Sequence, residues 1–265
     1  MPNVIGMCQI YNESTRCDKI SPVFFEKVVD FYKGLCDRII FLDDCSTDNT
    51  FDRIYFNLRK DDQIIKNRKN SWQSGNEVGN KIKLYKSVRQ MAPDFIISFD
   101  FDELLPYYFT RNYLEILISY LKKHILKALK FKWVNLWFSE GYSKADQLSR
   151  LSPPRMWMHD DRDKIISRPG FHNILWPKSI CDENTLITGL PLLHYSSVNY
   201  ENLLNKLKYY KKNSTIDWMT PLFKETSVLF ETKDIWFSKK IDRKDIKEEM
   251  ENCYNLQQKI LKELI

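Results

Sequence analysis

Three carboxylates, Asp100, Asp102 and Glu103, follow directly on an apolar run at residues 95–99. The run is short, bulky and partly β-branched, which predicts a buried central strand. Side chains alternate across an extended chain, so we expect Asp100 and Asp102 to project to one side and Phe101 to the other. Two carboxylates on one side are hard oxygen ligands, which suit Mg2+ or Mn2+ shared with substrate phosphates. A solvated acidic turn is the alternative interpretation.

A second group of acids follows another apolar run nearer the N-terminus. Residues 38–42 predict a buried strand, and Asp43 and Asp44 come at its end. A first strand is predicted over residues 4–10, and the polar cluster 11–14 follows it. Ligands of open α/β sheets bind outside the carboxyl ends of the strands, so we expect these segments to meet at one ligand site.

The segments between these strands have helical patterns. Helices are predicted over residues 21–34, from residue 46 or 47 to 57, and over residues 81–91, with capping or terminating residues at their ends. A further strand is predicted at residues 64–66. Strands and helices that alternate in this way predict an α/β fold with a mainly parallel central sheet flanked by helices.

The second half of the chain is patterned less clearly. Residues 126–140 predict core strands of a smaller antiparallel, acceptor-side region, and residues 241–265 predict an amphipathic C-terminal helix. We therefore expect one catalytic domain over residues 1–240, with a nucleotide-binding half of about 1–105 and an acceptor half of about 106–240.

The composition sets outer limits on the class of protein. The chain has 265 residues, of which 43% are hydrophobic, so it can bury the core of one large domain. The formal net charge of +6 and the pI near 8.8 favour anionic ligands. Both signs of charge are interspersed through the C-terminal third, without the one-sided basic stripe of a nucleic-acid-binding protein. We therefore expect no nucleic-acid partner.

The termini and the cysteines indicate the compartment. The six cysteines lack paired C-x-x-C spacing, so neither a zinc site nor a disulfide framework is predicted. No basic leader precedes an apolar N-terminal segment, and no uncharged run reaches transmembrane length. These patterns predict a soluble, cytoplasmic protein with reduced thiols. The predicted C-terminal helix would pack on the catalytic domain or make a peripheral contact with a membrane or a partner.

Three segments together resemble the successive motifs of family 2 GT-A glycosyltransferases. They are Ile-Tyr-Asn-Glu at 10–13, the block D-D-x-S-T-D-x-T within 37–50, and Phe-Asp-Phe-Asp-Glu at 99–103. The resemblance covers roughly the first 105 residues, and the D-D-x-S-T-D-x-T block is its most specific part. It implies a metal-dependent hexosyltransferase that moves a sugar, with inversion, from a nucleotide-sugar donor to a glycan or lipid-linked acceptor hydroxyl. A UDP-sugar is the donor that we favour.

The resemblance also implies roles for residues that would hold the donor. Tyr11 would stack on a pyrimidine, and Asp44, with Asp43 as the alternative, would accept a hydrogen bond from the base N3–H. Glu13 would approach the ribose, and Asp100 would reach the ribose or, through water, the metal. The structural alternatives are a packed aromatic for Tyr11 and helix capping for Asp43 or Asp44.

Metal ligands are implied in the same way. Asp102 is the first-choice ligand for Mn2+ or Mg2+, and Glu103 would be its neighbour in the site or a surface residue. His194 lies in residues 192–196, which resemble the segment by which many GT-A enzymes complete metal coordination. The alternative for His194 is a satisfied histidine of the core.

An inverting transfer needs a carboxylate that deprotonates the acceptor hydroxyl and is distinct from the metal ligands. Asp161 is the first candidate for this catalytic base and Asp160 the second, with Glu140 behind them. A solvated turn is the alternative for all three.

Basic side chains and rival functions complete the sequence-based hypothesis. Lys81 and Arg89 could contact the diphosphate or lie on a solvated helix face, and Arg155 could hold phosphate or acceptor. A nucleotidyltransferase would also use a sheet, acids and Mg2+, but the Gly-rich phosphate loop expected after the first strand is missing from the sequence. The non-enzymatic rival is a basic binding module for nucleic acid or anionic surfaces, which salt-dependent binding to unrelated DNA would favour.

Overall fold

The computed structural model describes residues 1–71, 77–137, 142–144, 152–164, 176–199, 201–202, 205 and 229–231. The chain divides into two compact units. Unit 1 is Met1–Lys132 with Leu151–Leu190, and unit 2 is Trp133–Arg150 with Pro191–Ile265. The division into a nucleotide-binding and an acceptor half of one catalytic domain stays a prediction.

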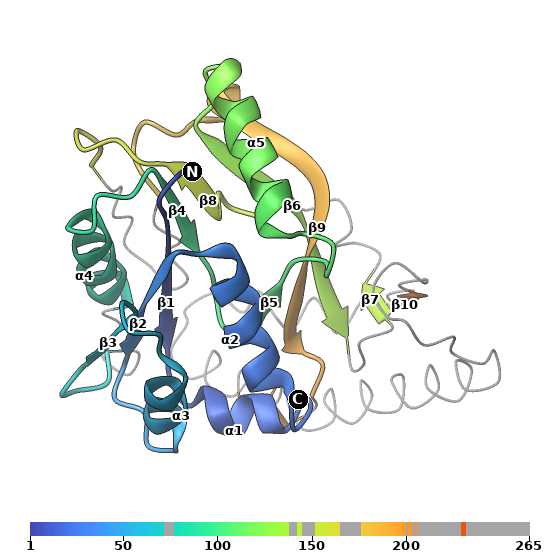
Figure 1. Ribbon diagram of the computed structural model, residues 1–265. Helices are drawn as coiled ribbons and strands as arrows, with labels where there is room; N and C mark the ends of the chain where they lie inside the picture. The colour runs from blue at the N-terminus through green and yellow to red at the C-terminus, as the bar shows by residue number, and fades with distance from the viewer. Residues whose placement is uncertain are drawn as a thin grey trace, which may run out of the picture. The chain divides into compact units, whose positions relative to one another are not determined.

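Unit 1 is organised around a parallel sheet. Its parallel strands are β1 (Val4–Ile10), β2 (Arg38–Asp43), β3 (Gln63–Lys66) and β4 (Phe95–Ser98), in the spatial order β4-β1-β2-β3 (Figure 1). The antiparallel strand β8 (Met156–Met158) lies on the outer side of β4. The predicted α/β fold with a mainly parallel sheet is confirmed.

The strand order contains a reversal of direction. The chain builds outward from β1 through β2 to β3 and then returns to place β4 on the other side of β1. Such a reversal separates the loops that follow the two central strands, and ligands of open α/β sheets bind in the space left there. The carboxyl ends of β1 and β4 are therefore where the topology favours a ligand.

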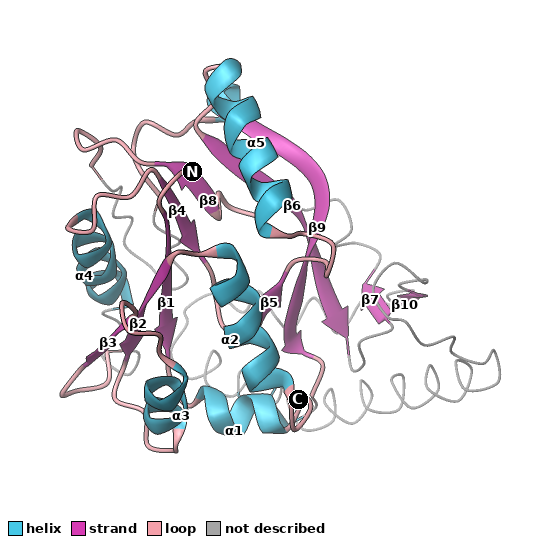
Figure 2. Cartoon of the chain, viewed as in Figure 1, coloured by secondary structure: helices cyan, strands magenta, loops and turns pink. Residues whose placement is uncertain are grey.

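Helices cover the parallel strands (Figure 2). They are α1 (Glu13–Asp18), α2 (Phe24–Leu35), α3 (Thr50–Asn57), α4 (Glu77–Arg89) and α5 (Arg111–Lys123). The sequence did not predict α1 or α5. It also placed the start of α2 at residue 21 and that of α4 at residue 81, each a few residues from the observed start.

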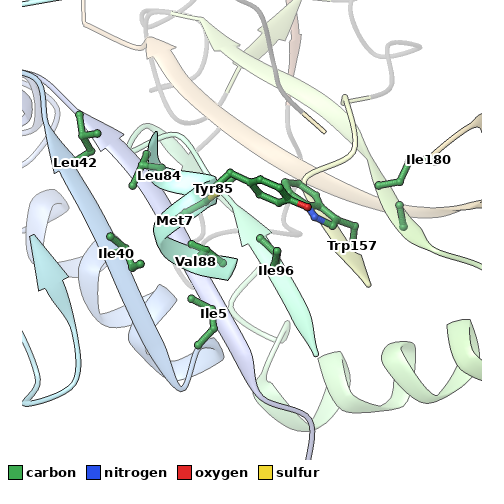
Figure 3. Packing of buried hydrophobic residues seen from close by; sticks show 11 residues of the cluster. Ile5, Met7, Ile40, Leu42, Leu84, Tyr85, Val88, Ile96, Trp157 and Ile180 are labelled. Carbon is green, nitrogen blue, oxygen red and sulfur yellow. The ribbon is translucent and has the colours of Figure 1, made fainter. Parts of the chain in front are cut away.

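One face of the sheet packs against α4 (Figure 3). Leu84, Tyr85 and Val88 of this helix contact the alternate, inward-facing side chains of the parallel strands and Trp157 of β8. The strand side chains in this cluster are Ile5, Met7, Ile40, Leu42 and Ile96. Full burial of each such side chain stabilises the folded state by roughly 1.5–3 kcal/mol. This cluster therefore holds the strands in register.

The other face packs against α2 through aromatic side chains. Tyr32 stacks on Phe99 with ring centroids 3.6 Å apart, and Phe25 lies 4.8 Å from the Phe101 ring. The Tyr32 hydroxyl donates a hydrogen bond to the Glu103 carbonyl at 2.9 Å. Helix α2 therefore fixes the backbone of the segment that carries the three acids.

Unit 2 contains antiparallel strand pairs. The end of β6 (Ala128–Trp137) pairs with β7 (Tyr142–Lys144), and β7 pairs with β10 (Leu229–Glu231). Strands β6 and β9 (Thr185–Ser197) each run from unit 1 into unit 2. The predicted C-terminal helix lies outside the described residues. None of the helices in the described part of the chain has an apolar stretch long enough to span a bilayer.

Candidate functional site

Two of the sequence motifs are joined by hydrogen bonds at the edge where β1 and β2 end. The Asn12 amide donates to Ser46 Oγ at 3.0 Å, and the Thr47 amide donates to Asn12 Oδ1 at 2.7 Å. The Ser14 amide donates to Thr50 Oγ1 at 2.8 Å. Asn12 has φ of 52°, a left-handed conformation that asparagine tolerates better than most residues. The hydroxyl and amide side chains of the motifs therefore hold the two loops together.

The acidic segment after β4 is a turn and not a continued strand. Strand β4 ends at Ser98, and the Glu103 amide donates to the Asp100 carbonyl at 3.0 Å. Phe101 is buried as predicted. The Asp100 side chain is 41% exposed and that of Asp102 only 8%, and the two carboxylates pair with different arginines. That both carboxylates project to one side stays a prediction.

Arg155 contacts two of the three acids. Its guanidinium contacts Asp100 Oδ2 at 2.6 Å and also the Glu103 carboxylate, and its carbonyl accepts the Ser98 amide at 2.8 Å. Both Arg155 and Glu103 are buried, so the surface alternative for Glu103 is wrong.

Burial and neighbouring charge separate the pKa values of these acids. Burial raises the pKa of Glu103 to about 8, although Arg155 opposes the shift. Burial acts in the same direction on Asp100, but Arg155 and Lys81 outweigh it and lower the pKa of Asp100 to about 2. Asp100 is thus held ionised at the exposed side of the turn.

A second arginine connects the end of β1 with the end of β4. Arg16 lies 2.9 Å from Glu13 Oε2 and 3.2 Å from Asp102 Oδ2. Burial raises the pKa of Glu13 to about 7, against the attraction of Arg16 and with added repulsion from Asp102. The two guanidinium groups thus face four carboxylates, those of Glu13, Asp102, Asp100 and Glu103, of which Asp100 is held ionised by its arginine.

The acids fit a metal site that substrate phosphates complete, and not one built from protein ligands alone. The described residues contain no group of three or more His, Cys, Asp or Glu side chains that could hold a metal by themselves. Mg2+ and similar ions are often held by one or two carboxylates together with substrate phosphates and water. Asp100 and Asp102 supply oxygen donors of that kind, so a cation completed by a phosphorylated substrate fits the residues present.

Asp44 lies at the end of β2 and is fully buried. Its oxygens accept hydrogen bonds from the Ser71 amide at 3.0 Å, the Ser71 hydroxyl at 2.8 Å and Asn67 Nδ2 at 3.0 Å. Burial would raise its pKa, but the bonds from Asn67, Asn80 and Ser71 outweigh it and lower the pKa. A nucleotide base could bind this carboxylate only by displacing Ser71 or Asn67.

We expect Asp44→Asn to lower the free energy of unfolding at pH 7 by about 1.5–3 kcal/mol, because charge-assisted hydrogen bonds are lost. The folded pKa of Asp44 is lowered, so its stabilisation is complete above the unfolded value of about 3.9. It is lost as the pH falls through the folded value. Urea unfolding of both proteins at pH 7 and below pH 4 should show the difference shrinking in acid.

Asp43 provides the matched control. It is equally buried, but burial raises its pKa despite hydrogen bonds from Ser46, so its charge does not stabilise the fold. Asp43→Asn should leave the stability at pH 7 unchanged or higher. An equal loss in the two variants would show that Asp44 has no special ionic role.

Asp160 and Asp161 lie at the opposite edge of the sheet from Asp100. Strand β8 is antiparallel to β4, and the amide of His159 donates to the Asp94 carbonyl at 3.0 Å. Strand β4 and the turn after it lie between that level and Asp100. This position favours another carboxylate as the catalytic base, and the role of Asp160 or Asp161 stays a prediction.

The opposite edge has its own contacts. Asp161 Oδ1 lies 2.9 Å from His159 Nε2, and Asp160 pairs with Arg162 at 3.0 Å. Arg89 donates to the Asp161 carbonyl, so it also lies far from the expected diphosphate. Of the two basic residues of α4 suggested by the sequence, only Lys81 is near enough to Asp100 to affect its pKa.

His194 belongs to the part of β9 in unit 2. It is half-buried, its Nδ1 lies 2.5 Å from Asn135 Oδ1 and 3.4 Å from Ser196 Oγ, and its ring lies 5.2 Å from that of Trp133. These contacts fix the ring by one nitrogen. Its role as a metal ligand stays a prediction.

The sequence contains only weak signals for the two arginines of the site. Arg16 follows Glu13 at the i,i+3 spacing of a helix, a signal that prediction of α1 would have exposed. Arg155 lies 52 residues from Glu103, and no local pattern connects them. Tyr11 is half-buried, and its stacking on a base stays a prediction.

The chain resembles solved glycosyltransferase structures. Staphylococcus aureus TarS 1–349 is 18% identical, with a TM-score of 0.37, over 59% of this chain and 47% of that one. The mannosyltransferase PcManGT from Pyrobaculum calidifontis, in complex with GDP-Man and Mn2+, is 19% identical with a TM-score of 0.35 over 48% of this chain and 34% of that one. A protein described as a nucleotide-diphospho-sugar transferase from Desulfovibrio desulfuricans G20 is 9% identical, with a TM-score of 0.39, over 81% of this chain and 90% of that one.

These are similarities of fold alone. The match spans just under half the length of the TarS structure. No protein-family model and no curated protein sequence matches the chain.

Proposed function

We propose that this protein transfers a sugar from a nucleotide-sugar donor, with a UDP-sugar favoured, to a hydroxyl of a glycan or lipid-linked acceptor. The supporting observation is the meeting of Asp102 with Glu13 and Arg16 where β1 and β4 diverge. The two segments that meet are both motifs of the resemblance. The topology also favours a ligand at this place.

The reaction breaks the bond between the anomeric carbon and the diphosphate oxygen and forms one to the acceptor oxygen. The acceptor proton passes to a base, and the nucleoside diphosphate leaves with the bonding electrons. Asp102 and Asp100 would orient the donor diphosphate through a shared cation, and Lys81 adds positive charge beside Asp100. Tyr11 and Glu13 would line the nucleoside side of the site. Inversion stays part of the proposal, with a base other than Asp160 and Asp161.

A divalent cation bound with the donor would supply electrostatic stabilisation of the leaving diphosphate. Asp102 would be its ligand, and Asp100 would bind it directly or through water. The partly exposed Arg16 already pairs with Asp102, so the cation would have to share or replace that partner.

A thermal-shift screen tests the donor class. We expect UDP with Mn2+ to raise the Tm of the full chain more than GDP or ADP with Mn2+, and more than UDP with a chelator. A ligand at about 100 times its Kd stabilises the native state by about 2.7 kcal/mol, which is a measurable shift. Equal shifts for UDP and GDP would contradict selection of the base by Tyr11 and Asp44. No Tm shift with any nucleotide, together with salt-sensitive DNA binding, would indicate a binding module instead of a transferase.

A further inference from the structure

Helix α5 carries apolar side chains on two of its faces. The face packed into unit 1 is formed by Leu114, Ile118 and Leu121, all buried. On another face Tyr113, Ile116 and Tyr120 are exposed at the i, i+3, i+7 spacing of one helical stripe. A surface helix ordinarily needs only the first of these stripes, so the second indicates a contact outside the fold.

Exposed apolar side chains also lie just beyond both ends of the helix. Tyr107, four residues before α5, is 79% exposed, and Ile125, two residues after it, is 86% exposed. Ile125 has φ of 58°, a conformation that is strained for a β-branched residue and is usually left to glycine at the end of a helix. We call Tyr107, Tyr113, Ile116, Tyr120 and Ile125 the α5 outer strip.

The charged residues in the segment that carries the α5 outer strip are mostly basic. Residues 107–127 include Lys122, Lys123 and Lys127, and their single acid, Glu115, pairs with Arg111 at 2.9 Å. Lys122 and Lys123 are exposed in the last turn of α5. The outer strip is therefore an apolar and aromatic surface bordered by lysines, with its acid already neutralised.

This chemistry identifies the occupant. Tyrosine at the headgroup level, isoleucine in the acyl boundary and lysine beside anionic headgroups are the combination of a membrane-surface segment. We propose that the α5 outer strip binds the surface of an anionic bilayer with α5 lying along it. The proposal rests on α5 and its neighbours and is independent of the donor chemistry.

Vesicle sedimentation of the full chain tests the proposal. We expect binding to phosphatidylcholine vesicles that contain phosphatidylserine, weaker binding as salt is raised, and little binding to phosphatidylcholine alone. The double variant Ile116→Ser/Ile125→Ser should lower partition at least about tenfold, because two apolar side chains no longer enter the bilayer. Lys122→Gln/Lys123→Gln should lower binding and flatten its salt dependence.

Phe56→Ser is the matched control, since Phe56 is 83% exposed on α3 and lies outside the outer strip. It should bind vesicles as the wild type does, and all variants should keep the wild-type Tm because the changed side chains are exposed. Failure of the wild type to bind phosphatidylserine vesicles would overturn the proposal. Wild-type binding by both strip variants would also overturn it. So would a wild-type dimer, seen by analytical sedimentation, that dissociates in the strip variants.

Discussion

Asp102→Asn should lower sugar transfer by at least about 100-fold, the scale of losing a main electrostatic group at a site of developing charge. The substitution keeps the volume of the side chain and removes the charge that would hold the cation. Arg16 keeps Glu13 as its partner at 2.9 Å, so we expect the variant to fold. Release of UDP from a panel of UDP-sugars with Mn2+, with and without added acceptors, measures the effect.

Asp161→Asn is the control for this experiment. Asp161 is an exposed acid at the other edge of the sheet, so its loss should leave both UDP release and Tm unchanged. Wild-type turnover by Asp102→Asn, or full wild-type activity in chelator, would remove the metal role of Asp102. A collapse of activity in Asp161→Asn would show that the acceptor side extends to that edge.

Arg155→Met should be the most destabilising single substitution in the site. Breaking a buried ion pair from one side leaves the other charge without compensation and costs roughly 3–5 kcal/mol. The stranded group would be Glu103, which is fully buried, and Asp100 would lose a partner at 2.6 Å. Urea unfolding of the variant at pH 9, where Glu103 with its pKa of about 8 is ionised in the wild type, would show a lower midpoint with an unchanged m-value.

The double variant Arg155→Met/Glu103→Gln separates the effect of losing the ion pair from the effect of leaving a charge on Glu103. Neutralising Glu103 removes the stranded charge, so the double variant should be more stable than Arg155→Met alone. Arg162→Met is the matched control, because Arg162 is 91% exposed and should leave the unfolding midpoint unchanged. Equal stability of the single and double variants would show that Glu103 is already protonated in the fold.

Much of unit 1 was predictable because its signals are local. The runs before Asp43 and Asp100 are mostly apolar, as expected for strands covered on both faces, and both proved to be parallel strands. The polar motifs after β1 and β2 proved to contact each other because parallel strands end at one edge.

The remainder depends on interactions between residues far apart in the chain. The direction of β8 beside β4 decides on which edge Asp160 and Asp161 lie, and no feature of residues 155–163 encodes that direction. Helix α5, in contrast, has a local signal, because Leu114, Ile118 and Leu121 recur at helical spacing after the Thr110 cap. Helix α1 is only six residues long, too short to show a period at all.

The place of β8 has a consequence for the order of assembly during synthesis. The segment that carries Asp100 and Glu103 leaves the ribosome about fifty residues before Arg155, whose guanidinium pairs with both acids in the fold. Until then β4 is an open sheet edge and Glu103 lacks its partner Arg155, a condition that invites pairing with other chains. A fragment that ends after the three motifs would retain this exposed edge permanently, so we expect it to aggregate more readily than the full chain.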